Sequence, residues 1–257
     1  MSKNNLASTG VRPDPSYGNP LDQFRYIYTL DSVSGKQVLD LASGVGWGSF
    51  LMSSAGATVI GIDVSQEAID FSSQYYSHSK VRFEKRDSST LNELDRVFDI
   101  ITCFETIEHI HNPQIFLQEL RSVSHHNTRL FLSTPNSILF GSDKGKPSNP
   151  YHLKEYNREE IVSLAQDSGW ELIEYLGQYP VPSQSIKIKQ YQGLITNYWR
   201  RKKLRRQFGV LYSVFNRLSA PSLYNLTDPA HDSPHVQPVP DNHEAAYHYM
   251  ILTPIKK

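Results

Sequence analysis

The segment VLDLASGVGWGSF, residues 38–50, constrains the fold more than any other stretch of this chain. An apolar run that contains one acid, Asp40, is followed by glycines at every second position, Gly44, Gly46 and Gly48. The run predicts a buried strand, and the glycines predict a tight turn in which the backbone can approach a ligand without an intervening side chain. The helix that follows offers its N–H groups and the positive end of its dipole to an anion. The segment therefore predicts a strand, a turn and a helix that together bind an anionic small molecule.

The rest of the chain continues the alternation of strand and helix. Further strands are expected at 57–63, 81–87, 98–104, 129–135, 170–177 and 246–254, and helices at 65–76, 112–123 and 157–169. Ser65 and Asn157 are suited to cap helices, Pro113 to a first helical turn, and Gly169 to a helix end. Such alternation predicts a parallel sheet with helices on both faces.

Composition limits the class of protein further. The 257 residues suffice for one sizeable domain, and the formal net charge of zero gives no overall attraction to nucleic acid or acidic membranes. Cys103 is the single cysteine, which excludes an internal disulfide and fits a reducing compartment. The N-terminal residues lack the apolar region of a signal peptide, and no run is long and apolar enough to span a membrane. We therefore expect a cytoplasmic protein without a transmembrane segment.

Two segments interrupt the alternation. Residues 1–35 form a Pro- and Gly-rich start and a helix, which we interpret as an N-terminal lid. Residues 180–243 carry 9 Lys/Arg and 3 Asp, whereas residues 1–179 carry 15 Lys/Arg and 22 Asp/Glu. We interpret 180–243 as a basic capping insertion between the last two strands. Its run WRRKKLRRQF, residues 199–208, is typical of a solvated helix face, of a contact with a phosphate-bearing acceptor or a membrane surface, or of RNA binding. Overall neutrality argues against nucleic acid.

Asp63 specifies what kind of ligand the glycine turn receives. It lies nineteen residues after Gly44, at the end of the next expected strand, where a carboxylate can accept hydrogen bonds from both hydroxyls of a ribose. The alternative is a tight turn with an incidental acid. The spacing G-x-G-x-G, with Ser49 in the position of the last glycine, disfavours the dinucleotide motif G-x-G-x-x-G and thus an NAD-dependent dehydrogenase.

These residues resemble motif I of the class I S-adenosylmethionine-dependent methyltransferases, in which a glycine usually stands at the position of Ala42. The segments VIGIDVS, RDSS, FDIITCFETIEHI and RLFLSTPN resemble the later motifs, so the resemblance covers about residues 36–176. It implies one Rossmann-like domain over 1–257: a seven-stranded, mostly parallel sheet with helices on both faces and an antiparallel last strand at 247–253.

The resemblance also implies the cofactor, S-adenosylmethionine, and the residues that bind it. The glycine turn would hold the methionine end, Asp63 the ribose, Asp87 the adenine amino group, and Ser88 the ring. Phe104 would pack against the cofactor or belong to the core, and Arg25 would pair with the cofactor carboxylate or lie exposed on its helix. The full set is Asp40, Ala42, Gly44, Gly46, Asp63, Asp87, Ser88, Phe104 and Arg25.

A second group of polar residues follows the strand at 98–104. Glu105, Glu108 and His109 share one side if their turn is helical, and they stand where an open α/β sheet places its site. Two carboxylates and an imidazole suit Mg²⁺ or Mn²⁺, and His152, in the loop after the next strand, is a fourth candidate ligand. Without a metal, His109 is a candidate general base, or it positions the cofactor.

This Glu-x-x-Glu-His turn resembles the metal site of small-RNA terminal 2′-O-methyltransferases. Together with NPYHLKEY, residues 149–156, it also resembles bacterial methyltransferases of sugar and polysaccharide biosynthesis. We therefore expect an S-adenosylmethionine-dependent O-methyltransferase that acts on a hydroxyl of a sugar, glycan or natural product. The alternatives are a metal-dependent RNA 2′-O-methyltransferase and a non-catalytic cofactor-binding partner protein.

Overall fold

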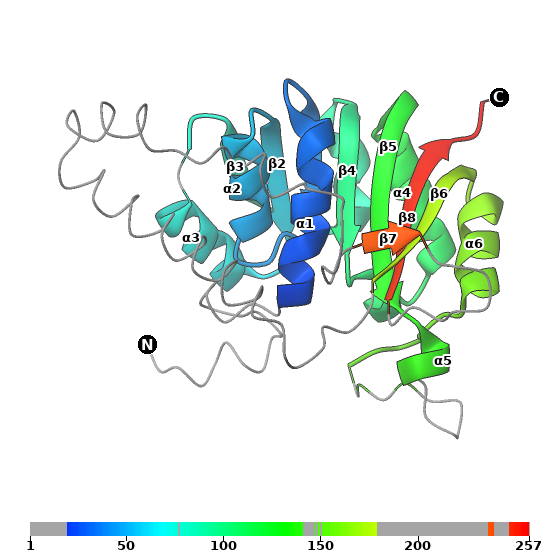
Figure 1. The fold of residues 1–257 in the computed structure, drawn as a ribbon. Helices are drawn as coiled ribbons and strands as arrows, with labels where there is room; N and C mark the ends of the chain where they lie inside the picture. The colour runs from blue at the N-terminus through cyan, green and yellow to red at the C-terminus, as the bar shows by residue number, and fades with distance from the viewer. Residues whose placement is uncertain are drawn as a thin grey trace. The chain divides into compact units, whose positions relative to one another are not determined.

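One mixed β-sheet organises the computed structural model of the chain (Figure 1). The structure describes residues 20–76, 78–140, 147, 149, 151–178, 236–238 and 247–256. Residues 1–19, the basic run 199–208 and nearly all of 180–243 lie outside this part of the chain. The lid and the capping insertion therefore stay predictions.

The sheet confirms the expected architecture. Its strands are β1 (Gln37–Leu41), β2 (Thr58–Asp63), β3 (Val81–Lys85), β4 (Phe98–Phe104), β5 (Ser124–Pro135), β6 (Trp170–Gln178), β7 (Val236–Pro238) and β8 (Tyr247–Pro254), in the order β3-β2-β1-β4-β5-β8-β6-β7. The pairs from β3 to β5 are parallel, and β8 runs antiparallel to both β5 and β6. The short β7 pairs with the end of β6 and adds an eighth strand that the sequence pattern did not predict.

The helices begin where their capping residues predict. The α-helices are α1 (Pro20–Val33), α2 (Trp47–Ser54), α3 (Gln66–Tyr75), α4 (Pro113–Ser122), α5 (Ser137–Phe140) and α6 (Arg158–Asp167), and the 3₁₀ turns are η3 (Ser88–Leu94) and η4 (Ile107–His109). The Ser65 hydroxyl accepts the Ala68 N–H at the start of α3, and Asn157 and Glu160 form a reciprocal capping box at the start of α6. Across the described residues, none of these helices is long and apolar enough to cross a membrane.

Alternating strand residues supply two separate apolar layers. On one face, Leu39 and Ile101 pack with apolar side chains of η3, α4 and α6. On the other, Val38 and Ile100 pack with Val33 of α1 and other apolar residues that include Met52 of α2. Because successive strand residues point to opposite faces, the central strands need apolar residues on both faces. They have them, with Asp40 of β1 and Asp99 and Thr102 of β4 as polar exceptions. The sheet is therefore covered by helices on both sides (Figure 1).

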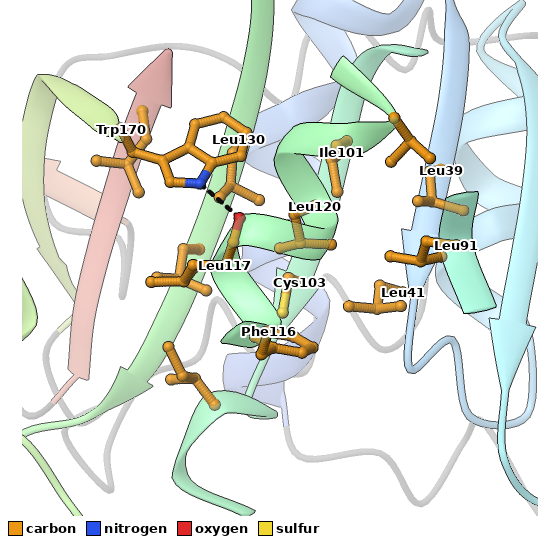
Figure 2. Close-up of a cluster of buried hydrophobic side chains, with 14 of the residues drawn as sticks. Leu39, Leu41, Leu91, Ile101, Cys103, Phe116, Leu117, Leu120, Leu130 and Trp170 are labelled. Atoms are coloured by element: carbon orange, nitrogen blue, oxygen red, sulfur yellow. Dashed lines mark hydrogen bonds between the residues drawn. The ribbon is translucent and has the colours of Figure 1, made fainter. Parts of the chain in front are cut away.

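Trp170 closes the larger of the two layers (Figure 2). Its ring is fully buried at the start of β6, and its indole N–H donates to the carbonyl oxygen of Leu117 in α4 at 2.9 Å. Cys103 lies in the same layer, where burial raises the pKa of its thiol well above the usual value. The cysteine is therefore a packing residue rather than a nucleophile.

The strand order fixes where a ligand can bind. The chain runs outward from β1 to β2 and β3 on one side, and crosses back to β4 and β5 on the other. At such a reversal, loops diverge beyond the carboxyl ends of the two central strands and leave a crevice. The loops after β1 and β4 are the glycine turn and the Glu105–His109 turn.

We predict that Trp170→Phe lowers the free energy of unfolding by about 2 kcal/mol. The smaller ring leaves unfilled space in the core, and the hydrogen bond to α4 is lost. Urea unfolding followed by circular dichroism measures the change. Ile173→Ala is the matched control, because that side chain is 52% exposed on the same strand. Equal losses in the two variants would contradict this account of the core.

Candidate functional site

The glycine turn contains three residues in the left-handed region, Ala42 (φ 54°), Gly44 (φ 54°) and Gly46 (φ 82°). A Cβ added at Gly44 would meet no atom within 4 Å, so this backbone faces open space. A Cβ at Gly46 would lie 2.5 Å from Cβ of Ser72 and 2.6 Å from the Phe83 ring. Gly44 thus leaves room for a ligand, whereas Gly46 is required by packing as well as by conformation.

Ala42 stands where the family motif usually has a glycine, and the structure shows the effect of the added methyl group. Its side chain is exposed, so the methyl group meets no steric obstacle in the protein. Its left-handed conformation is unfavourable for a residue with a Cβ by about 1–2 kcal/mol. Alanine in place of glycine therefore strains the backbone but does not clash with neighbouring protein atoms.

Asp40 lies beneath the turn. Its carboxylate is fully buried and accepts hydrogen bonds from the hydroxyls of Ser49 (2.5 Å), Thr102 (2.7 Å) and Tyr26 (3.0 Å). Burial raises the pKa of Asp40 to about 6, although the three hydroxyls oppose the rise. Asp40 joins β1 to α2, β4 and α1 and thereby helps to position the turn. Its predicted role in cofactor binding stays a prediction.

Asp63 connects the turn to the end of β2. Its two carboxylate oxygens accept the N–H groups of Gly44 and Ser65, each at 2.9 Å. A carboxylate offers about four acceptor positions, so two remain for the hydroxyls of a ribose. The same side chain can thus stabilise the turn and recognise the ligand.

A pocket of about 480 Å³ lies next along this edge of the sheet. Its lining residues are Val64, Lys85, Arg86, Asp87, Thr90 and Glu93. The Ser89 N–H donates to the Asp87 carboxylate and lowers its pKa, so Asp87 is an ionised acceptor suited to an adenine amino group. The pocket includes Asp87 as the sequence predicted, but Ser88 is not among its lining residues.

Arg25 is buried, in contrast to an exposed helical arginine. Its Nε–H donates to Oε1 of Gln178 at 2.8 Å, its Nη1 lies 3.3 Å from Oε1 of Glu105, and its guanidinium stacks over the Tyr247 ring at 4.5 Å. Arg25 thus holds α1 to the ends of β4, β6 and β8. Whether it also pairs with a cofactor carboxylate stays a prediction.

Phe104 at the end of β4 is half-buried between aromatic neighbours. Its ring centroid lies 5.0 Å from that of Tyr26 and 5.7 Å from that of Tyr249. It therefore belongs to the edge of the core, and its remaining exposed surface is what a cofactor could contact.

The Glu105–His109 turn is not one continuous helical turn. The 3₁₀ helix η4 begins at Ile107, and Glu105 precedes it with a left-handed φ of 50°. Oε1 of Glu105 lies 3.3 Å from Nη1 of Arg25 and accepts the Ser133 hydroxyl at 2.9 Å. A shared side was expected for one helical turn that includes all three residues, and this condition is not met because Glu105 lies outside η4.

Glu108 is almost completely buried, with 1% exposure. Its Oε2 accepts the Thr134 hydroxyl at 2.9 Å. Burial, reinforced by the nearby charge of Glu105, raises the pKa of Glu108 to about 8. A carboxyl group in this environment is unfavourable as an isolated anion and calls for a compensating partner.

His109 and His152 meet beside Glu108. The loop that carries His152 is held there because the N–H groups of Leu153 and Lys154 donate to the carbonyl oxygen of Glu108 at 2.7 and 3.3 Å. The two imidazole centroids are 4.9 Å apart. One ligand atom each from Glu108, His109 and His152 lies within 4.8 Å of the others, and Glu105 is not part of this group. The loop after β5 thus reaches the end of β4, as the sequence predicted.

A family model described as a methyltransferase domain matches residues 23–175, more than half of the chain. The chain belongs to the class I S-adenosylmethionine-dependent methyltransferases. It is 29% identical over 184 residues to a probable S-adenosylmethionine-dependent methyltransferase of Mycolicibacterium smegmatis, covering 68% of this chain and 69% of the relative. It is 32% identical over 172 residues to the ubiquinone biosynthesis O-methyltransferase of Coxiella burnetii, covering 62% and 73%.

A solved structure shares the fold. Magnesium protoporphyrin IX methyltransferase from Synechocystis PCC 6803, determined with bound SAH, aligns with a TM-score of 0.51 and 19% identity over 70% of this chain and 84% of that one. By its family and its curated relatives, the chain is an enzyme that uses S-adenosylmethionine. The open backbone at Gly44, the acceptor Asp63 and the pocket beside Asp87 fit the three parts of this cofactor in order along one edge of the sheet.

Several supporting residues escaped prediction from the sequence. Tyr26, Ser49 and Thr102 surround Asp40, and Ser133 and Thr134 bind the two glutamates. Their signal is weak, because the local sequence around a hydroxyl residue does not show which distant carboxylate it will contact. A polar pair at the end of the otherwise apolar run RLFLSTP could have indicated Ser133 and Thr134.

We predict that Asp63→Ala weakens binding of S-adenosylhomocysteine by roughly 30- to 150-fold, which corresponds to about 2–3 kcal/mol for hydrogen bonds to a charged group. Titration calorimetry measures the change, and circular dichroism checks the fold. Glu67→Ala, at an exposed position one turn away, is the control and should keep the wild-type affinity. An unchanged affinity in Asp63→Ala would remove Asp63 from the site.

Asp40 should make stability depend on pH in a defined direction. Its folded pKa of about 6 lies above the ordinary value of 3.8, so the protonated carboxyl favours the folded state below about pH 4 and this contribution is lost as the pH rises through 6. Asp40→Asn cannot titrate. The stability of the wild type relative to this variant should therefore fall by about 3 kcal/mol between pH 4 and pH 7. Urea unfolding at several pH values tests this, and parallel profiles for the two proteins would refute it.

Proposed function

We propose that this methyltransferase methylates a hydroxyl oxygen, with a sugar or glycan as the first candidate acceptor. The observation that carries the proposal is the group formed by Glu108, His109 and His152 at the end of β4. β4 pairs directly with β1, so this group stands beside the glycine turn where the cofactor methyl group would be delivered. Methylating an alcohol oxygen requires that its proton be removed. An imidazole or a bound cation among Glu108, His109 and His152 could assist that step.

His109 is suited to accept that proton. Its Nδ1 lies 2.9 Å from the carbonyl oxygen of Tyr151, and since a carbonyl can only accept, Nδ1 carries the hydrogen and Nε2 keeps its lone pair. Partial burial lowers the pKa of His109, which favours the neutral imidazole. When bound, S-adenosylmethionine supplies an electrophilic methyl group. The residues of the chain align the acceptor and receive its proton, directly on His109 or with the help of a cation.

An apolar hydroxyl-bearing molecule is a second candidate acceptor. The similarity to a ubiquinone biosynthesis O-methyltransferase supports oxygen as the acceptor atom. Exposed apolar side chains also gather on α5 and on the loop that carries His152: Ile138, Leu139, Tyr151 and Leu153. Such side chains favour an acceptor with an apolar or aromatic face. The sugar candidate is supported by the resemblance of NPYHLKEY and the Glu-x-x-Glu-His turn to bacterial sugar methyltransferases.

A panel of acceptors tests the proposal. Purified protein is incubated with labelled S-adenosylmethionine and with neutral sugars, nucleotide-sugars, phosphate-bearing glycolipids, apolar phenols and RNA, and methylated products are analysed by mass spectrometry. We expect an O-methyl ether on a sugar or glycan. Transfer to nitrogen or carbon alone, or to RNA alone, would contradict the sugar proposal. Cofactor binding without turnover on any acceptor class would favour a non-catalytic partner protein.

With the true acceptor, His109→Ala should slow methyl transfer by roughly 10²-fold or more, the contribution of a positioned acid–base group. Affinity for S-adenosylhomocysteine should stay close to that of the wild type, because His109 is not in the glycine turn. His111→Ala, an exposed histidine two residues on, is the control and should retain activity. A wild-type rate in His109→Ala would assign this histidine a structural role.

A further inference from the structure

We propose that Glu108, His109 and His152 bind one divalent ion of a first-row transition metal. One carboxylate and two imidazoles converge, with a ligand atom of each within 4.8 Å of the others. The three residues come from two segments, η4 and the loop before α6, and backbone hydrogen bonds from Leu153 and Lys154 to the carbonyl of Glu108 fix these segments together. The arrangement is therefore preorganised by the backbone rather than by chance contact of mobile side chains.

Both imidazoles are oriented in the way that metal-binding histidines usually are. Nδ1 of His109 lies against the carbonyl oxygen of Tyr151 at 2.9 Å, and Nδ1 of His152 lies against Oε1 of Glu155 at 2.7 Å. Both oxygen partners fix the hydrogen on Nδ1 and direct the lone pair to Nε2. The side chain of Glu155 is only 2% exposed, so this support is itself held within the protein.

Glu108 provides an independent indication of a missing ligand. Its Oε1 is buried, and no donor in the described part of the chain bonds to it, while Oε2 is occupied by Thr134. A buried carboxylate oxygen without a partner is costly. A cation that binds Oε1 would satisfy this atom and offset the charge of a second carboxylate, Glu105, nearby.

One existing contact must be exchanged. The side-chain amide of Asn149 donates to Nε2 of His152 at 2.9 Å. This is a single neutral hydrogen bond, and a metal ion would replace it. Glu105 is not a ligand in this proposal, because its Oε1 is engaged by Arg25 and Ser133. The set of four ligands expected from the sequence is thus reduced to three.

The donor atoms restrict the metal. Mg²⁺ and Ca²⁺ prefer oxygen ligands throughout, whereas two imidazole nitrogens and one carboxylate suit Mn²⁺, Fe²⁺, Co²⁺ or Zn²⁺. Three protein ligands leave coordination positions for water or an acceptor hydroxyl. The role of the ion, lowering the pKa of that hydroxyl, rests on the proposed function; its binding does not.

Metal binding is measured without any acceptor. Full-length protein, first stripped with chelator and then saturated with S-adenosylhomocysteine, is titrated with Mn²⁺, and the loss of the free-ion electron paramagnetic resonance signal reports binding. We expect one Mn²⁺ per chain, retained for the most part against a tenfold excess of Mg²⁺. Co²⁺ should bind at the same stoichiometry and displace Mn²⁺.

Variants assign the site. Glu108→Gln and His152→Ala should each weaken Mn²⁺ binding at least tenfold, and Glu155→Gln, which acts through His152, should weaken it by roughly 10- to 100-fold. Asn149→Ala should not weaken it, because the amide competes for the same nitrogen. His125→Ala is the matched control, since His125 also contacts a carboxylate, that of Asp99, but at the start of β5. Binding of S-adenosylhomocysteine verifies folding, and His152→Ala decides alone if the Glu108 variant does not fold.

The outcomes separate this proposal from the proposed function. Absence of stoichiometric Mn²⁺ and Co²⁺ binding in protein that binds S-adenosylhomocysteine would overturn the metal site. So would binding that is unchanged in His152→Ala, since it would then arise from other histidines among the ten in the chain. Methylation of a hydroxyl at full rate in excess EDTA would keep the function and remove the metal. Metal bound at these residues without O-methylation of any acceptor would keep the metal site and remove the proposed function.

Discussion

The buried carboxylate of Asp40 is the interaction on which the cofactor half of the site depends. Hydroxyls from α1, α2 and β4 converge on it, so one side chain of β1 fixes the elements that surround the glycine turn. The same burial raises the pKa of Asp40 to about 6. The protein accepts a carboxyl group that is unfavourable as an anion because three hydrogen bonds to it determine where the turn lies.

The candidate site has two parts along the edge of the sheet, on either side of the β1–β4 pair. The cofactor half follows β1, β2 and β3, where Gly44, Asp63 and Asp87 present an open backbone and two carboxylates. The proposed acceptor half follows β4 and β5, where Glu108 and His109 meet the loop before α6. The buried Arg25 pairs with the partly exposed Glu105 and joins α1 to the end of β4. Each half uses a carboxylate that accepts hydroxyl groups from a neighbouring element, so the two are built on the same principle.

Local chemistry explains why so much of the fold followed from the sequence. Ser65 and Asn157 predict the starts of their helices, because a side-chain oxygen satisfies one of the first N–H groups of a helix. The central strands are recognisable as largely apolar runs, because both of their faces are buried. β7 gave no such signal, since three residues on an edge form no periodic pattern.

The site was harder to predict, because its details depend on contacts between distant segments. Spacing predicted that Glu105, Glu108 and His109 share one side if their turn is helical, but Glu105 precedes the 3₁₀ helix with a left-handed φ and pairs with Arg25. His152 was predicted to reach the end of β4, whereas the support that Glu155 gives it could be seen only once the loop was folded. Sequence thus named the chemical groups, and the structure determined which of them meet.

The most direct test of the account is a calorimetric titration of the wild-type protein with S-adenosylhomocysteine and, separately, with NAD. Both ligands carry an adenosine that Asp63 and the Asp87 pocket could receive, but the glycine spacing G-x-G-x-G departs from the dinucleotide motif G-x-G-x-x-G. The account predicts saturable binding of one S-adenosylhomocysteine per chain and no heat from NAD. Saturable binding of NAD, with no binding of S-adenosylhomocysteine, would contradict it.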